Sequence, residues 1–130
     1  MRDVVIVDSV RTGLTKAFRG SFNLTRSDDM LAHCIDSLLD RNPNLSPDEV
    51  EDVVVGAATH AGEQDGNLAR LAVVLSKLPI TVAGVSINRF CSSGLQAIAI
   101  AANQIASGQT EVAIAGGVDS CLLYTSPSPR

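Results

Sequence analysis

The stretch 88–95 combines a thiol with small neighbours at the junction of two predicted elements. Cys91 follows an apolar run that predicts a strand and precedes one that predicts a helix, which opens on Ser92, Ser93 and Gly94. A helix N-terminus favours the thiolate, and its N–H groups can hold the oxyanion that forms when sulfur attacks a carbonyl. An ordinary thiol is only about 3% ionised at pH 7, so this placement would matter. Position alone leaves Cys91 as either a nucleophile or a small cysteine at a tight junction.

The other residues able to do chemistry are few. Three widely spaced cysteines exclude a complete disulfide scaffold and favour a reducing compartment. His33, Cys34 and His60 could share a metal in principle, but no paired ligand spacing occurs, so we expect no metal site. Cys34 lies in an apolar helical stripe and is therefore expected in the core. Cys121 has no role that the sequence supports.

Composition excludes several functions. The chain has 130 residues, 45% of them apolar and 18% charged, which is typical of one folded domain. Four aromatic residues and a net charge of −4 argue against a nucleic-acid-binding surface. The apolar run Val4–Val7 is too short for a signal peptide or a membrane helix, so we expect a cytoplasmic protein without a membrane span.

Hydrophobic patterns predict alternating strands and helices. Expected strands are 4–7, 53–55, 84–89 and 112–115; expected helices are 31–39, a short one opening on Ser46–Glu49, one marked by Leu68–Leu75, and 92–107. Ser27 is expected to cap the first helix. This order predicts an α/β fold with a mostly parallel sheet and helices on both faces. The helix 92–107 is apolar nearly all round, which suggests that another layer covers it, as in one half of a larger protein.

Several motifs together resemble the thiolase family. Asn88 and the run Cys91–Ala97 closely resemble its nucleophile signature. Ser9–Thr12 looks like the exit of its first strand, and Gly66–Arg70 resembles its G-x-N-P-A-R helix start, with Leu68 for Pro. Ala115–Ser120 is similar to its Gly-Gly-x-Glu-Ser stretch, with Asp119 for Glu. The resemblance covers residues 1–120, and Ser92 makes the chain look more like a degradative 3-ketoacyl-CoA thiolase, an enzyme of fatty acid β-oxidation.

The resemblance implies a fold, a reaction and partners. It implies the N-terminal half of a thiolase-like fold, with the four predicted strands in the order 3-2-1-4. Cys91 would accept the acyl group from 3-ketoacyl-CoA and pass it to CoA, and its backbone N–H would contribute to an oxyanion hole. CoA would be a substrate, and no metal or redox cofactor is implied. The full-length protein would form a homodimer or tetramer through the strand near Val85–Arg89.

The chain also departs from the family pattern. Its members are longer, and the His of their Gly-His-Pro motif, the second Cys and the Asn-bearing motif have no counterpart here. His33 and His60 match no such motif. We therefore expect residues 1–120 to be a truncated N-terminal domain without thiolysis by itself. Residues 121–130 have no family counterpart, and their Pro- and Ser-rich composition predicts a disordered or non-native tail.

Other interpretations remain open at the level of sequence. A related ketoacyl-synthase-type condensing enzyme would place its cysteine similarly but would take acyl groups from a carrier protein. A hydrolase elbow, G-x-C-x-G, would need glycine where Arg89 and Ser93 stand. A dinucleotide-binding domain would need G-x-G-x-x-G after the first strand, where only Gly13 occurs. The chain could also be an inactive, non-enzymatic fragment. Acyl chain length is not encoded in these motifs.

Overall fold

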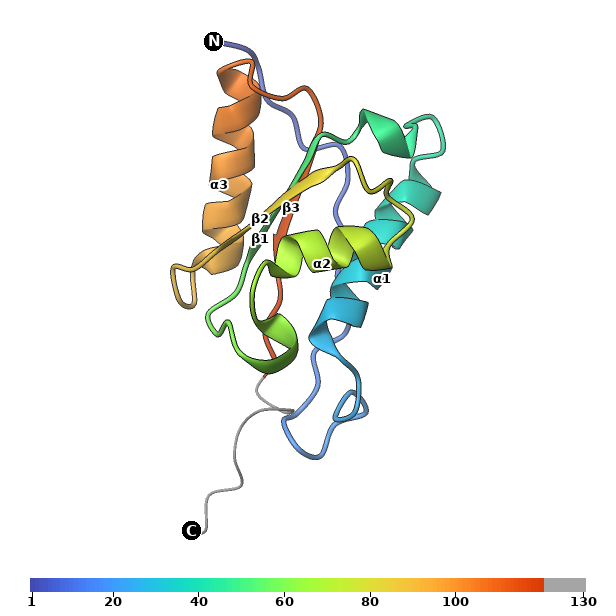
Figure 1. Cartoon of the computed structure of the whole chain (residues 1–130), viewed down its shortest axis with the longest axis vertical. Helices are drawn as coiled ribbons and strands as arrows, with labels where there is room; N and C mark the ends of the chain where they lie inside the picture. Colours follow the sequence, from blue (N-terminus) through green and yellow to red (C-terminus); the bar gives the residue numbers. More distant parts are fainter. Residues whose placement is uncertain (121–130) are drawn as a thin grey trace.

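The computed structural model describes residues 1–120, in which three helices flank a three-stranded parallel sheet (Figure 1). In chain order the elements are α1 Ser27–Arg41, β1 Asp52–Gly56, α2 Leu68–Leu75, β2 Ala83–Ile87, α3 Ser93–Ala106 and β3 Ala113–Gly117. Two short 3-10 turns, Pro47–Glu49 and Gly62–Gln64, precede β1 and α2. Helices α1 and α2 lie on one side of the sheet and α3 on the other (Figure 1). The predicted α/β fold with helices on both faces is confirmed.

The central strand β1 separates two apolar cores. The alternation of side chains along a strand sends Val53 and Val55 to one face and Val54 to the other. The first face packs under α1 and α2 against branched side chains, including Leu31, Ile35, Leu39, Leu68 and Val73. The second face packs under α3, where Val54 meets mainly alanines: Ala97, Ala101, Ala113 and Ala115. The small side chains of this second core allow α3 to lie close to the sheet.

The order of the sheet corrects one prediction. The strands lie in the order β2-β1-β3, and β1 pairs with both neighbours along its whole length, from Asp52 to Gly56. The predicted first strand, Val4–Val7, is therefore not inserted between them and is no strand at all; Val5, Ile6 and Val7 are 75–79% exposed. A β-branched run favours extended backbone, but a strand also needs a partner strand. The predicted position lies between β1 and β3, and these two strands already pair with each other there.

The N-terminal segment is nevertheless held at both ends. The Arg2 N–H donates to the Ala106 carbonyl at 3.1 Å, and the Arg2 side chain pairs with Glu111. Asp8 accepts from the Asn42 side chain at 2.9 Å and from Arg41 at 2.8 Å. The bond from Asn42, then that from the Ser9 N–H, and the charge of Arg41 lower the pKa of Asp8. The segment thus runs from the end of α3 to the end of α1 (Figure 1).

The start of α1 differs from the predicted cap. Arg26, not Ser27, is the N-cap residue. The Ser27 N–H is buried and donates to Glu63 Oε1 at 2.6 Å. A carboxylate 36 residues away therefore satisfies a helix N–H that a local cap would otherwise serve. Arg26 in turn pairs with the buried Asp28 at 2.8 Å.

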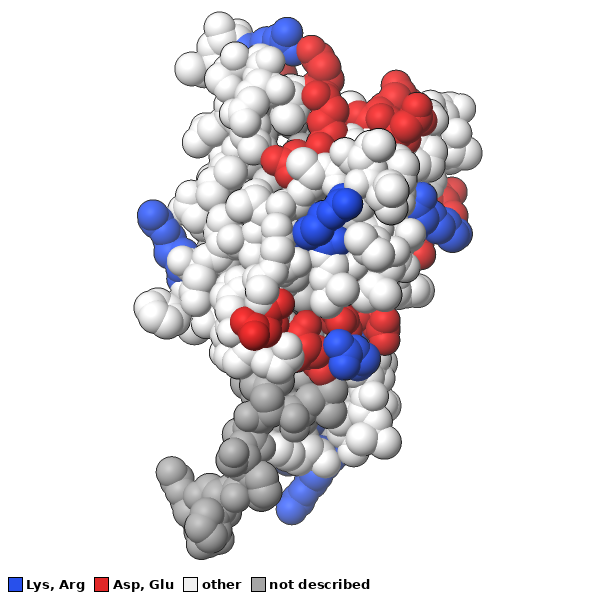
Figure 2. Space-filling model, viewed as in Figure 1, with Lys and Arg blue, Asp and Glu red and all other residues white. Residues whose placement is uncertain are grey.

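Basic and acidic side chains are distributed differently on the surface. On the face drawn in Figure 2, basic side chains are separated from one another and acidic ones gather in several groups. Among the helices of residues 1–120, none is long and apolar enough to cross a bilayer.

Candidate active site

Cys91 lies in the turn that joins β2 to α3. β2 ends at Ile87, Ser92 is the N-cap residue of α3, and the helix begins at Ser93. Cys91 is exposed, as an attacking group must be if substrate is to reach it. The predicted strand-to-helix placement of this thiol is confirmed. The first N–H groups of a helix lack carbonyl partners within the helix, and at the start of α3 the Ser93 N–H donates to the Phe90 carbonyl of the turn at 3.1 Å.

A set of short hydrogen bonds holds the turn around Cys91. Ser93 Oγ accepts from the Arg89 N–H at 2.8 Å and donates to the Phe90 carbonyl at 2.5 Å. The Ser92 hydroxyl donates to the Arg89 carbonyl at 2.9 Å. Phe90 has a φ of 48°, a left-handed conformation that bulky residues rarely adopt. Such backbone strain persists only where the surrounding structure holds the residue in place.

Glycines allow α3 to start directly above the ends of the strands. A Cβ on Gly56 would lie 2.2 Å from the Ser93 carbonyl oxygen, and one on Gly117 would lie 2.9 Å from the Gly94 Cα. Both contacts are to backbone and are too short for any side chain. The glycines at the ends of β1 and β3 thus set the height of α3, and with it the position of Cys91.

The Gly66–Arg70 motif fixes β2, the strand that leads to Cys91. Asn67 is the N-cap residue of α2: its Oδ1 accepts from the Arg70 N–H at 3.0 Å, and its Nδ2 donates to the Gly84 carbonyl at 2.8 Å. Ser86 Oγ of β2 accepts from the Ala69 N–H at 3.0 Å. Because Asn67 both caps α2 and bonds β2, it fixes the position of the helix relative to the strand.

Two polar side chains meet at the loop after β1. Asp119, just past β3, accepts from the Ala58 N–H at 3.1 Å, and Asn88, just past β2, donates to the Ala58 carbonyl at 3.1 Å. His60 Nε2 lies 2.9 Å from the Ala57 carbonyl and 3.3 Å from that of Ile87. Because both neighbours are acceptors, Nε2 carries the proton, which leaves only Nδ1 as a base.

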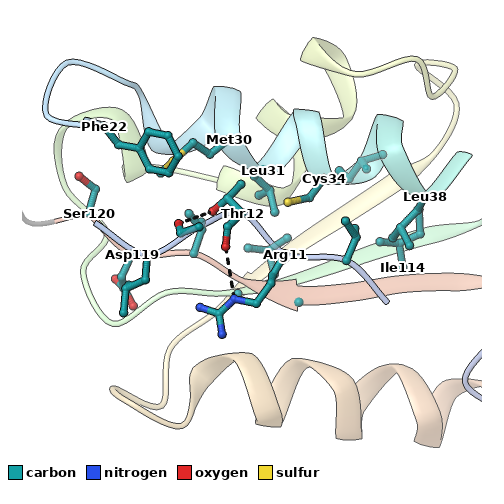
Figure 3. Close-up of a pocket in the computed structure, with 18 of the residues that line it drawn as sticks. Arg11, Thr12, Phe22, Met30, Leu31, Cys34, Leu38, Ile114, Asp119 and Ser120 are labelled. Atoms are coloured by element: carbon teal, nitrogen blue, oxygen red, sulfur yellow. Dashed lines mark hydrogen bonds between the residues drawn. The ribbon is translucent and has the colours of Figure 1, made fainter. Parts of the chain in front are cut away.

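A cavity among the described residues lies away from Cys91. It has a volume of about 510 Å³ and is formed by the segment 10–17, α1 and the end of β3, on the side of the sheet opposite α3 (Figure 3). Cys34 points into it and is half-buried. Burial raises the pKa of the Cys34 thiol, although a hydrogen bond from the Thr12 backbone partly offsets that rise. The cavity therefore contains a cysteine that burial makes less reactive.

The structure separates the other residues that the sequence singled out. His33 is exposed on α1, and His60 lies in the loop after β1. Within residues 1–120, no three His, Cys, Asp or Glu side chains converge as metal ligands. Cys121 and the predicted tail lie outside the described residues. The sequence did not predict that Asn88 and Asp119 both contact the backbone of Ala58. The available signal was Asn88 itself, because an asparagine often accepts from the N–H two residues on, here that of Phe90.

The chain is thus an α/β protein with a parallel sheet, in which an exposed cysteine lies in the turn between the edge strand β2 and helix α3. Residues 4–123 match the model of the thiolase N-terminal domain, and the chain belongs to the thiolase family. It is 45% identical over 120 residues to a β-ketoadipyl-CoA thiolase of Pseudomonas putida, covering 92% of this chain and 30% of that protein.

A second group of relatives is named for a different substrate. The chain is 42% identical over 119 residues to a 3-ketoacyl-CoA thiolase of Aeromonas salmonicida, covering 92% of this chain and 31% of the relative. A 3-ketoacyl-CoA thiolase of Pseudoalteromonas atlantica is 40% identical over the same length. The chain thus spans about 30% of the length of the curated relatives it matches. The family resemblance inferred from the motifs is confirmed.

Proposed function

We propose that this chain provides the nucleophilic part of a thiolase that cleaves 3-ketoacyl-CoA with CoA. The observation that carries the proposal is the exposed Cys91 in the turn before α3, next to Phe90, whose left-handed conformation is held by a hydrogen bond from Ser93. The contrast with Cys34, which is half-buried and whose pKa is raised by burial, supports the choice of nucleophile. The names of the relatives support a 3-ketoacyl-CoA substrate.

The proposed reaction has two steps. In the first, the Cys91 thiolate attacks the 3-keto carbon, and the bond between carbons 2 and 3 breaks. The electron pair stays on carbon 2, which takes a proton, and acetyl-CoA leaves the acyl group on sulfur. In the second, the thiolate of another CoA attacks this thioester, a shortened acyl-CoA leaves, and the Cys91 thiolate returns. The backbone N–H of Cys91 would contribute to stabilising the oxyanion in both steps.

The proposal includes assembly through β2. Within residues 1–120, β2 pairs with β1 on one side and with no strand on the other. Val85 is 38% exposed on this edge. Unpaired N–H and C=O groups on an edge strand favour pairing with another chain, so we propose that two copies associate along β2. We propose no metal or redox cofactor for the reaction.

The nucleophile can be tested by joining residues 1–120 to the remaining part of a curated relative. With 3-ketoacyl-CoA and no second CoA, peptide mass spectrometry should find the acyl group on Cys91. Cys91→Ser should abolish turnover, and Cys34→Ala should retain most of it. Loss of activity in folded Cys34→Ala would overturn the assignment, and acylation only from a carrier protein would favour a condensing enzyme instead.

A further inference from the structure

We propose that Asn88 and Asp119 are positioning residues for Cys91 that act together through the peptide groups of Ala58. This inference rests on the proposed function, because it assigns them to the same nucleophile. Neither side chain is assigned a role by the reaction itself. Both are placed by the ends of strands, Asn88 after β2 and Asp119 after β3, on opposite sides of β1.

Asn88 contacts the turn directly. Its Oδ1 accepts from the Phe90 N–H at 2.8 Å, and Phe90 is the residue with positive φ that precedes Cys91. An asparagine that bonds the amide two residues on forms a local turn and restrains the residue between them. The side chain of Asn88 therefore fixes Phe90, the strained residue that sets the orientation of Cys91.

Asn88 is itself fixed from the neighbouring loop. Its Nδ2 donates to the Ala58 carbonyl at 3.1 Å, so one side chain joins the loop after β1 to the turn after β2. Without this second bond, rotation of the Asn88 side chain would release the Phe90 amide. The orientation of Asn88 thus depends on where Ala58 lies.

Asp119 fixes Ala58 from the other side. Both of its carboxylate oxygens lie 3.1 Å from the Ala58 N–H, and Oδ1 is 3.4 Å from the Thr59 N–H. The fully buried Gln64 supports the same loop by donating to the Thr59 carbonyl at 2.6 Å. A carboxylate that accepts from backbone amides makes a strong, charge-assisted contact. The three strand ends are thereby linked in one line: Asp119, Ala58, Asn88, then the turn of Cys91.

The test compares two reactions of Cys91 in the 130-residue chain. One is alkylation by iodoacetamide. Both reactions need an accessible thiolate, but only acylation by p-nitrophenyl acetate passes through an oxyanion, so only acylation is accelerated by an oriented oxyanion site. Peptide mass spectrometry gives both rates for Cys91. Asn88→Ala and Asp119→Ala should each lower the ratio of acylation to alkylation by about tenfold, a fraction of the roughly hundredfold that a 1 Å misplacement can cost. A merely structural role would change both rates alike.

Because the two residues act through one peptide group, their effects should not add. The double variant should lose no more than the worse single variant, whereas independent roles would multiply to about a hundredfold. Asp119→Asn, which keeps an acceptor, and Asn88→Asp, which keeps the acceptor for Phe90, should restore part of the ratio. Matched controls are Asn103→Ala on the exposed side of α3 and Asp3→Asn in the exposed N-terminal segment.

The outcomes separate this inference from the proposed function. A ratio within twofold of the original in folded Asn88→Ala and Asp119→Ala would overturn the positioning role, and so would multiplicative losses. If circular dichroism shows that an alanine variant is unfolded, Asn88→Asp and Asp119→Asn decide, since an unchanged ratio in both overturns the proposal. A Cys91 in the original chain that acylates no faster than Cys34 would instead refute the proposed nucleophile.

Discussion

Gly56→Ala should move α3 and so disturb both stability and the turn of Cys91. The added Cβ would lie 2.2 Å from the Ser93 carbonyl oxygen and 2.3 Å from its carbon. Both atoms belong to the helix backbone and cannot rotate away. The start of α3 must therefore rise by roughly 1 Å to regain ordinary contact, a displacement that costs about 1–3 kcal/mol in a close-packed interior.

The same displacement should reach the chemistry. Ser93 Oγ bonds both Arg89 and Phe90, so a shift of Ser93 pulls on the two residues before Cys91. Urea unfolding followed by circular dichroism would measure the stability, and alkylation and acylation of Cys91 would report the turn. We expect a lower free energy of unfolding and a reduced ratio of acylation to alkylation.

Gly116→Ala is the matched control for Gly56→Ala. Gly116 lies on the adjacent strand β3, where an added Cβ has open space and φ is not positive. Because alanine loses less backbone entropy on folding than glycine, the control should be neutral or stabilised by up to about 1 kcal/mol. If Gly56→Ala unfolds within 0.5 kcal/mol of Gly116→Ala, a difference that surface changes rarely exceed, α3 does not depend on this contact.

Three further results are expected. Because burial raises the pKa of Cys34, it should stay protonated at pH 7–8 and alkylate more slowly than Cys91, gaining rate only as the solution becomes more alkaline; equal rates at neutral pH would contradict its burial. Sedimentation at tens of micromolar should show self-association that Val85→Lys on β2 reduces and that Val74→Lys, at an exposed position of α2, does not; a single monomeric species of the original chain would exclude pairing along β2. Glu63→Ala should cost about 1–3 kcal/mol by leaving the buried Ser27 N–H unpaired. Loss of the exposed Arg2–Glu111 pair through Glu111→Ala should cost only about 0–1 kcal/mol, so similar losses in both would argue against the buried bond.

Local patterns predicted most of the elements, because their signals are contained within each segment. The apolar spacing from Leu31 to Leu39 predicted α1, whose Leu31, Ile35 and Leu39 are buried. The capping pattern at Ser46–Glu49 marks a true turn, in which Glu49 Oε2 accepts from the Ser46 N–H at 2.7 Å, although the turn is only three residues long. The valine run that follows imposes extended backbone and ends it.

The predictions that were wrong concern features that depend on contacts between distant residues. Val4–Val7 and Val53–Val55 have similar sequences, yet only the second pairs in the sheet. Side-chain type sets the preference for extended backbone, while the choice of partner is a tertiary property. The bond from the Ser27 N–H of α1 to the distant Glu63 is likewise a tertiary contact. So are the bonds of the Ala58 backbone to Asn88 and Asp119, because the residue type alanine gives no indication of them.

The unlike cores on the two sides of β1 imply that relatives of this chain can diverge in two different ways. Beneath α1 and α2, branched residues such as Ile35 and Val73 can exchange with one another, because a loss at one site can be refilled at its neighbour. Beneath α3, Ala97 and Ala101 can be replaced by a smaller residue only if it is glycine, and a larger residue would push α3 away from the sheet. The buried positions under α1 and α2 should therefore vary widely among relatives, and those under α3 should vary little. The inward face of α3, the helix that follows Cys91, should change more slowly in evolution than those of α1 and α2.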